Sequence, residues 1–277
     1  MTVAAVGPTV GMPARVLMIG NFDGVHRGHQ QLITSTLRQA RILSTIQARP
    51  CALTFSPHPR RFFQGDAAPP MLTDDEERAR LLATYGIEET IVLPFDAPLS
   101  GLSADEFSWD ILKTRLGAVH VVVGAGYRFG RSREGGVEDL HRLAGLHGYG
   151  LTVVDLAAGA DRQAFSSTRV RNALADGDLL TAMAILGRPW SRRVVIITEQ
   201  GRAKIASGAR LPLPAGVYQV AVRIMDGDAA MQITTAHVDD DGGAVLDWSV
   251  PDAPVTVELQ WLDRAPCGAL KRGRRYG

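Results

Sequence analysis

The chain has few cysteines, little net charge and no long apolar run. Cys51 and Cys267 are the only cysteines among 277 residues, too few and too scattered for a disulfide framework or a cysteine metal site. A net charge of +1 at pH 7 gives no global attraction to nucleic acid or to an acidic membrane. These absences argue against secreted disulfide scaffolds and against strongly basic nucleic-acid-binding proteins.

The N-terminal stretch MTVAAVGPTVGMPARVLMIG lacks the features of a secretory leader. It has no basic start, and glycines and prolines interrupt its apolar residues. No segment is apolar over the length needed to cross a bilayer. We therefore expect a cytoplasmic protein that acts on small molecules, without nucleic-acid or membrane partners; the sequence leaves its oligomeric state open.

Between residues 16 and 155, short apolar runs alternate with amphipathic segments. The apolar runs are RVLMIG, CALTF, TIVLPF, VHVVVG and LTVVDL. The segments between them have helical spacing: HQQLITSTLRQARIL, DDEERARLLATYG, SADEFSWDILKTRLG and VEDLHRLAGLHGYG. Such alternation predicts an α/β fold, a Rossmann-like domain whose parallel sheet is covered on both faces.

The pattern changes near GRPWSRR. Two more helical segments, STRVRNALADG and LLTAMAILG, precede this point, and only strand-like pieces separated by Gly, Asp and Pro turns follow it. The second half therefore predicts a small antiparallel β-barrel. We expect two domains, residues 1–189 and 190–277.

The stretch IGNFDGVHRGHQQLI (19–33) lies where the first predicted strand gives way to the first predicted helix. In an open parallel sheet, ligands bind at the carboxyl ends of the strands, and a helix N-terminus offers free N–H groups to a phosphate. His26 and His29, one turn apart, can both donate hydrogen bonds to phosphate oxygens, and Gly28 permits close approach. The stretch thus predicts a phosphate-binding loop.

Two other interpretations of this stretch remain. A metal site would need a third ligand, for which Asp23 and His58 are candidates, but the sequence has no HExxH pattern and nothing fixes a tetrahedral set. Alternatively, the two histidines could be a purely structural pair in an ordinary turn.

The stretch GNFDGVHRGH resembles the HxGH signature of nucleotidyltransferases, in the form carried by prokaryotic bifunctional riboflavin kinase/FAD synthetases. Three further blocks follow in the family's order: TFSPHPRRFF (54–63), VVVGAGYRFGRSREGG (121–136) and FSSTRVRNALADGDLLTAMAILGRPW (165–190). The resemblance covers residues 16–190 almost continuously. It implies a nucleotidyltransferase domain followed by a barrel related to riboflavin kinase.

The resemblance implies transfer of AMP from ATP to the phosphate of FMN, which gives FAD and pyrophosphate with the help of Mg²⁺. The FMN phosphate can attack directly, so catalysis would depend on positioning and charge neutralisation. Three residues would then be catalytic: His26, His29 and Arg171. Arg171 of the SSTxxR segment would grip the leaving pyrophosphate.

The same resemblance implies further contacts to ATP and to its metal. The expected ATP-binding residues are Gly20, Asn21, Phe22, Asp23, Gly28, Ser166, Ser167 and Thr168. Mg²⁺ would be held through the phosphates, with Asp23 as the one side-chain candidate. We expect Ser167 and Thr168 also to cap the helix that they open; a plain capping sequence on a surface helix is the alternative for SSTxxR.

The acceptor would be bound by the second and third blocks. The expected acceptor-binding residues are His58, Pro59, Tyr127, Arg128 and Phe129. Pro57 and Pro59 predict a stiff loop that presents His58 to the flavin phosphate. A rigid surface turn and a flexible loop are the alternatives for these two blocks.

The chain departs from the family pattern in two places. Gly126 stands where the family has Asp or Asn before the aromatic position, which weakens the case for FMN as acceptor. The kinase PTxN motif is absent from the barrel, although Glu258 matches the position of the kinase base. We therefore expect no riboflavin kinase activity. A nucleotidyltransferase with another phosphomonoester or nucleotide, and a non-catalytic nucleotide- or flavin-binding protein, are the alternatives.

Overall fold

The computed structural model describes residues 13–155, 163–199, 201–206, 211–225, 230–249 and 254–265. Its contacts divide the chain into two compact units, Met1–Phe165 and Ser166–Gly277. This division falls before the expected boundary at 189/190, because helices α7 and α8 contact each other and α8 contacts strands β6 and β11. The boundary between functional domains stays a prediction. Cys267 and the basic tail LKRGRRYG lie outside the described residues.

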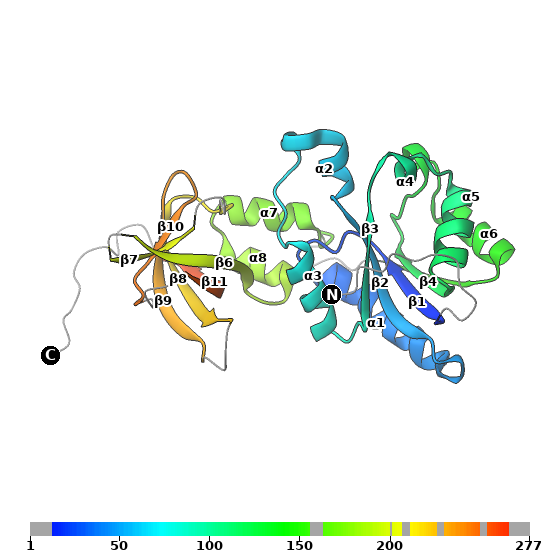
Figure 1. Cartoon of the computed structure of the whole chain (residues 1–277), viewed down its shortest axis with the longest axis horizontal. Helices are drawn as coiled ribbons and strands as arrows, with labels where there is room; N and C mark the ends of the chain where they lie inside the picture. The colour runs from blue at the N-terminus through cyan, green and yellow to red at the C-terminus, as the bar shows by residue number, and fades with distance from the viewer. Residues whose placement is uncertain are drawn as a thin grey trace. The chain divides into compact units, whose positions relative to one another are not determined.

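The first unit is built on a five-stranded sheet in the order β3-β2-β1-β4-β5 (Figure 1). All four strand pairings are parallel, which confirms the predicted sheet. Its strands are β1 (Arg15–Ile19), β2 (Arg49–Ser56), β3 (Glu89–Pro94), β4 (Ala118–Gly124) and β5 (Gly150–Val154). The chain runs outward from β1 to β3 and then returns to place β4 on the other side of β1. This reversal is the topological switch point, where open α/β sheets bind ligands.

The connections between these strands are mostly helical. The α-helices are α1 (Arg27–Ile42), α2 (Pro59–Gln64), α3 (Asp75–Thr84), α4 (Ala97–Gly101), α5 (Ala104–Glu106) and α6 (Val137–His147). Three 3₁₀ turns are η1 (Ser44–Ile46), η2 (Gly65–Ala67) and η4 (Arg131–Arg133). The helix expected over 103–117 is α5 followed by a π-helix, η3 (Phe107–Arg115). The stiff loop expected after β2 contains the short helix α2.

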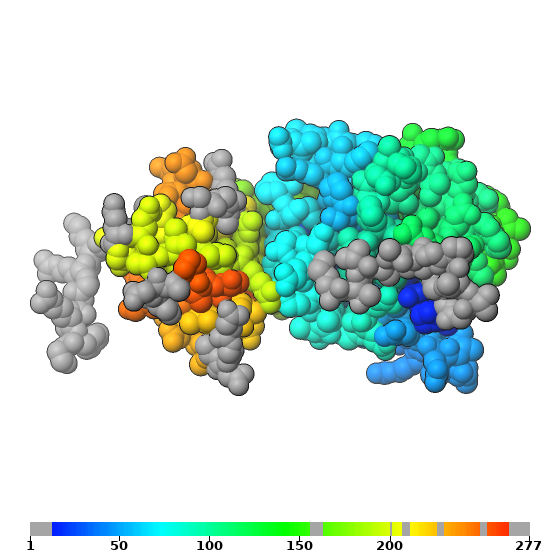
Figure 2. Space-filling model, in the orientation of Figure 1, coloured from blue at the N-terminus to red at the C-terminus, as the bar shows by residue number. Residues whose placement is uncertain are grey.

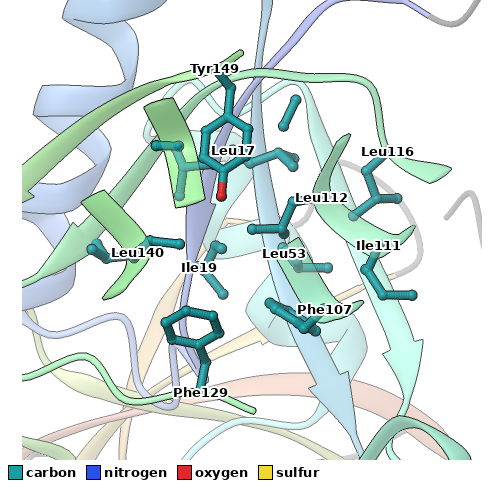
Figure 3. Packing of buried hydrophobic residues seen from close by; sticks show 14 of the residues in the cluster. Leu17, Ile19, Leu53, Phe107, Ile111, Leu112, Leu116, Phe129, Leu140 and Tyr149 are labelled. Carbon is teal, nitrogen blue, oxygen red and sulfur yellow. The ribbon is translucent and has the colours of Figure 1, made fainter. Parts of the chain in front are cut away.

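Two hydrophobic clusters cover the two faces of the sheet. Because side chains alternate along a strand, Leu17 and Ile19 belong to one cluster and Val16 and Met18 to the other. The first cluster includes residues of η3 and α6, such as Leu112 (Figure 3). The second includes residues of α1 and α3. The sheet is therefore sandwiched between helices, as its apolar strands predict.

The second unit contains α7 (Ser167–Ala175), α8 (Leu179–Leu186) and a closed barrel in the order β10-β7-β6-β11-β8-β9. Its strands are β6 (Trp190–Glu199), β7 (Arg202–Ile205), β8 (Gly216–Ile224), β9 (Gln232–Val238), β10 (Ala244–Leu246) and β11 (Val255–Arg264). All pairings are antiparallel, so the predicted barrel is confirmed; β7 was not predicted. In Figure 2 segments coloured from yellow to orange-red lie side by side on the surface of this unit.

The barrel interior is built around aromatic side chains. The rings of Trp190 and Trp261 stack with centroids 6.1 Å apart, and Tyr218 meets Trp261 edge-on at 5.5 Å. All three are buried. Across both units, none of the described helices is long and apolar enough to span a membrane.

Candidate active site

The loop between β1 and α1 has an unusual backbone. Phe22, Gly24 and Val25 have positive φ angles of 49°, 78° and 42°, a conformation that is rare for a β-branched residue. The Gly20 N–H donates to Leu53 O of β2 at 3.1 Å, and the Val25 N–H donates to Phe22 O at 3.1 Å. Such strain persists only where the surroundings over-determine it, and it is concentrated at functional sites.

His26 is the N-cap of α1. Its Nδ1 accepts the backbone N–H of His29 at 3.4 Å, and its side chain is buried. Because Nδ1 accepts, the neutral ring carries its proton on Nε2, which leaves Nε2–H as its donor. The rings of His26 and His29 stack with centroids 3.6 Å apart and an interplanar angle of 18°. The expected pair is therefore held as one unit at the start of the helix.

His29 is half-buried and neutral. The ring of Phe22 meets it edge-on at 5.3 Å, and its Nδ1 is buried without a hydrogen-bond partner in the described part of the chain. Burial lowers the pKa of His29 well below its usual value, and electrostatic repulsion from His26, whenever that ring is protonated, and from Arg78 lowers this pKa further. A neutral imidazole can donate one hydrogen bond and accept another, so it can contact a phosphate oxygen.

Gly28 lies close to the ring of His26. A Cβ at this position would lie 3.2 Å from both Cε1 and Nδ1 of His26 and 3.5 Å from the carbonyl oxygen of Phe165. A side chain here would therefore require the His26 ring to shift by a few tenths of an ångström. The sequence predicted close approach of a ligand at Gly28; the structure adds close approach of the ring.

The buried carboxylate of Asp23 makes a contact that the sequence did not predict; its expected role toward ATP and Mg²⁺ stays a prediction. Its buried Oδ1 accepts the N–H groups of Leu72 at 2.9 Å and of Thr73 at 3.1 Å. In return, the Gly24 N–H donates to Thr73 Oγ1 at 3.1 Å. Asp23 thus fastens the segment before α3 to the β1–α1 loop. Asn21 is also held by a hydrogen bond: its backbone carbonyl oxygen accepts from the Thr54 hydroxyl at 3.3 Å.

The described residues contain no cluster of three His, Cys, Asp or Glu side chains that could hold a metal ion. Oδ1 of Asp23 accepts two N–H groups, so a contact from Asp23 to Mg²⁺ would have to use the other carboxylate oxygen; this contact stays a prediction. The metal interpretation of the two histidines would therefore need a third ligand from outside the described residues.

The acceptor blocks follow the neighbouring strands. His58 and Pro59 come after β2, and residues 126–129 come after β4, so both lie at the same edge of the sheet as the histidine loop. His58 is the N-cap of α2, and its Nδ1 accepts the Arg60 N–H at 3.0 Å. The structure brings these expected residues to one edge; their contact with an acceptor stays a prediction.

Tyr127 and Phe129 stack with ring centroids 5.6 Å apart and an interplanar angle of 12°. Phe129 is only 6% exposed and belongs to the hydrophobic core, where Figure 3 shows it near Phe107. Phe129 therefore supports Tyr127 from the core side; its expected contact with the acceptor stays a prediction. Tyr127 is half-buried, and burial raises the pKa of its hydroxyl, so it stays neutral. Arg128 is exposed.

The SSTRVR segment opens α7 in the second unit. The cap is Ser166, whose Oγ accepts the Arg169 N–H at 3.3 Å. The expectation that Ser167 and Thr168 cap this helix is wrong: they occupy its first turn, because the chain turns helical one residue earlier. Ser167 and Arg171 are half-buried, and Thr168 is exposed. Their approach to the histidine pair stays a prediction.

Sequence reasoning missed Thr73 and Arg78. Thr73 binds Asp23 across a long stretch of chain, a contact that no local pattern reveals. Arg78 lies in a charged helical segment that reads as solvent-exposed, yet its side chain is 1% exposed. The sequence offered one signal near these two residues: Asp74 is a typical N-cap residue and so marks the start of α3. In the structure its side chain accepts the Glu77 N–H at 2.7 Å.

Glu258 of the barrel is engaged in a local network. Its carboxylate accepts from Arg223 Nη2 and, at 3.4 Å, from Gln260 Nε2. The side chain is 15% exposed. This cross-strand ion pair gives Glu258 a structural role within the barrel wall.

Comparison with known proteins identifies relatives of the chain. The family model described as FAD synthetase matches residues 12–169. The bifunctional riboflavin kinase/FMN adenylyltransferase of Escherichia coli (strain K12) is 37% identical over 216 residues, which cover 75% of this chain and 67% of that protein. The protein of the same description from Pseudomonas fluorescens is 35% identical over 226 residues, covering 77% of this chain and 70% of that protein.

A solved structure from Streptococcus pneumoniae, described as a macrolide-efflux protein, has the same fold. It aligns with a TM-score of 0.75 and 25% identity, over 96% of this chain and 90% of that one. With the four motifs in order, the matched family model and relatives above one-third identity, this chain belongs to the FAD synthetase family, the family of the bacterial FMN adenylyltransferases.

Proposed function

We propose that this chain transfers AMP from ATP to the phosphate of FMN, which yields FAD and pyrophosphate. The observation that carries the proposal is the stacked pair of His26 and His29 at the start of α1, directly after β1. A helix N-terminus attracts phosphate through its free N–H groups and its dipole. Membership of the FAD synthetase family supports the choice of FMN as acceptor.

The reaction needs one displacement at phosphorus. An oxygen of the FMN phosphate bonds to the α-phosphorus of ATP, and the bond from that phosphorus to the bridging oxygen breaks. Pyrophosphate leaves with this oxygen. The protein's task is to hold the two phosphates in line and to stabilise the developing charge. Nε2–H of His26 and the neutral ring of His29 supply hydrogen-bond donors of fixed orientation for that purpose.

ATP enters as its Mg²⁺ complex. The ion then arrives bound to the phosphates and belongs to the substrate, in keeping with the engaged carboxylate of Asp23. Arg171 is proposed to grip the leaving pyrophosphate, for which a planar guanidinium that binds two oxygens at once is well suited. Ser166 holds the helix that carries Arg171.

FMN is proposed to bind along the ends of β2 and β4. His58 and Arg128 would contact its phosphate, and Tyr127, braced by Phe129, would lie against the ring. Gly126 favours a second candidate, a nucleotidyltransferase for another phosphomonoester, because it provides no polar side chain beside the flavin ring. A pyrophosphate-release screen with ATP and CTP against FMN and a panel of phosphomonoesters separates the two candidates.

The barrel is proposed to lack riboflavin kinase activity. The PTxN motif is absent from the sequence, and the carboxylate of Glu258 is paired with Arg223. Both features favour a barrel that stabilises the first domain or binds a ligand or partner without catalysing phosphorylation. Incubation with riboflavin and Mg²⁺–ATP, followed by chromatography, tests this proposal: enzyme-dependent FMN would overturn it.

FAD formation from FMN and Mg²⁺–ATP, followed by chromatography, tests the main activity. His29→Ala removes a phosphate contact. We expect its loss to cost about 1.5–3 kcal/mol of transition-state stabilisation, or roughly 10- to 150-fold in kcat/KM. His141→Ala, at an exposed position on α6, is the matched control and should behave as wild type. Wild-type turnover by His29→Ala would contradict the phosphate role of the loop.

A further inference from the structure

The loop between β4 and α6 (residues 125–136) carries Tyr127 and is closed at its base. Phe129 and Gly135 exchange two backbone hydrogen bonds, from the Phe129 N–H to Gly135 O at 3.1 Å and from the Gly135 N–H to Phe129 O at 2.9 Å. The ring of Tyr127 stacks on that of Phe129. The position of the Tyr127 ring therefore depends on where this base is held.

Two hydrogen bonds tie the outer part of this loop to the segment that opens α5. The Arg131 N–H donates to Leu102 O at 2.7 Å, and the Ala104 N–H donates to Oε1 of Glu134 at 3.0 Å. We call these two bonds the clasp. Ala104 is the first residue of α5, so its N–H is one of those that a helix cannot satisfy internally. Glu134 supplies the acceptor for this N–H from the loop.

Two glycines let the loop pack directly against Ala104. A Cβ on Gly130, whose φ is 75°, would lie 2.7 Å from the backbone nitrogen of Ala104. A Cβ on Gly135 would lie 2.9 Å from the Cβ of Ala104 and 2.8 Å from the ring of Phe129. Separations this short would force the loop away from α5 or displace the Phe129 ring. The glycines of the GRSREGG stretch therefore permit a close contact between the loop and α5.

Helix α5 is a firm support for the clasp. Ser103 and Glu106 form a capping box: the Ser103 N–H donates to Glu106 Oε2 at 2.8 Å, and the Glu106 N–H donates to Ser103 Oγ at 3.2 Å. Helix α5 runs directly into η3, where the buried Ser108 Oγ lies 2.8 Å from His147 Nδ1 and 2.6 Å from the Tyr149 hydroxyl. These contacts fix α5 on the first unit, so a loop bonded to α5 shares its position.

We propose that Glu134 is a positioning residue for the acceptor, because its bond to Ala104 holds the β4–α6 loop, and with it the Tyr127 ring, in place. Without the clasp the loop occupies other positions as well, and the apparent affinity for FMN falls with the fraction of protein whose loop is in place. ATP, proposed to bind at the β1–α1 loop, is not affected in this way. The inference rests on the proposed function for its consequence in FMN binding, whereas the clasp can be tested without turnover.

Limited proteolysis tests the clasp in the absence of substrate. Arg131 is exposed on the loop, and trypsin cleavage after it reports how often the loop leaves its position. Ala104→Pro removes the N–H donor at the first helical position, where proline is tolerated, and Ser103 already has the extended backbone that precedes proline. The sequence of the loop stays the same in this variant. Cleavage after Arg131, followed by mass spectrometry, should be about three- to tenfold faster than in wild type.

Variants of Glu134 test the same bond from the other side. Glu134→Ala removes the acceptor and should raise the cleavage rate by a similar factor, whereas Glu134→Gln keeps an oxygen acceptor and should stay close to wild type. The double variant with Ala104→Pro should be cleaved no faster than the single variants, because each of them already removes the same bond. Glu138→Ala, at an exposed position on α6, is the matched control and should be cleaved as wild type is. Unchanged cleavage in both Ala104→Pro and Glu134→Ala would overturn the inference.

The same variants are then compared in FAD synthesis. In Glu134→Ala and Ala104→Pro, the KM for FMN should rise about three- to tenfold. The KM for ATP should stay unchanged, and Glu134→Gln should restore the KM for FMN. Equal increases in both KM values, or an unchanged KM for FMN, would overturn the inference, because either result indicates a merely structural role for the clasp.

The two proposals fail in distinguishable ways. A wild-type protein that makes no FAD, but whose cleavage after Arg131 responds to Ala104→Pro, would contradict the proposed function and confirm the clasp. A wild-type protein that makes FAD, with cleavage and the KM for FMN indifferent to Ala104→Pro and Glu134→Ala, would contradict the inference alone.

Discussion

His26 and His29 stack at 3.6 Å while the N–H of His29 donates to Nδ1 of His26. One pair of residues therefore makes both the cap of α1 and the stacked rings of the site. A change that rotates one imidazole must disturb the other and must also release an N–H at the start of the helix. Gly28 lies between them in the sequence, and a Cβ built on it would be 3.2 Å from the His26 ring.

Gly28→Ala should impair catalysis more than stability. Its Cβ would lie 3.2 Å from the His26 ring, so the ring must move, whereas alanine itself favours a helix by about 1 kcal/mol over glycine. We expect a loss of about tenfold or more in kcat/KM for ATP. Steady-state kinetics and thermal unfolding measure the two effects. Gly145→Ala, on α6 with no atom within 4 Å of its Cβ, is the control and should keep full activity.

His29 should make the protein less stable toward acid. Its pKa is lowered in the folded protein, so above the unfolded value of about 6.5 both states are neutral and it contributes no pH dependence. Below that value the unfolded chain binds the proton more readily, and the free energy of unfolding falls. His29→Asn should therefore lose less stability than wild type between about pH 7.5 and 5.5.

Thermal unfolding at each pH measures these losses. The second unit and the other histidines contribute equally to the pH dependence of wild type and variant, so the difference between the two proteins reports on His29 alone. His141→Asn serves as the surface control and should follow wild type. Equal losses in wild type and His29→Asn would mean that the pKa of His29 is the same in the folded and the unfolded protein, and would contradict the lowered pKa.

Asp23→Ala should destabilise the first unit strongly. The substitution leaves the buried N–H groups of Leu72 and Thr73 without their acceptor, at a cost of about 2–5 kcal/mol. Asp23→Asn keeps an oxygen that can accept and should retain most of the stability. The Mg²⁺ requirement of FAD synthesis should be the same in Asp23→Asn and wild type; a markedly raised requirement would show that Asp23 does hold the metal.

A polar residue at Gly126 should improve the use of FMN. Gly126 is exposed and no atom lies within 4 Å of a Cβ built on it, so Asp or Asn fits without rearrangement. One restored hydrogen bond is worth about 1–3 kcal/mol, or roughly ten- to a hundredfold in the KM for FMN. Gly126→Ala separates the added carbon from the polar group and should give no gain. The absence of a gain with either polar residue would favour another acceptor.

The alternation of apolar runs and amphipathic segments was enough to predict the parallel sheet and the barrel, because each depends on a period that is visible along the chain. The π-helix at 107–115 and helix α2 were beyond that signal, since both are local departures from regular spacing. The histidine pair was found from its position after β1. The hydrogen bonds from Thr73 to Asp23 and the burial of Arg78 could not be predicted from the sequence, because tertiary contacts between distant segments determine both.

The switch point between β1 and β4 separates the two halves of the site along the chain. The loop proposed to hold the nucleotide follows β1, and the loop that carries Tyr127 follows β4, about a hundred residues later. Each loop is anchored by its own strand, so substitutions in one leave the backbone of the other untouched. Over evolutionary time, a lineage with this fold can exchange its acceptor by altering the β4 loop while the ancestral nucleotide machinery is inherited intact.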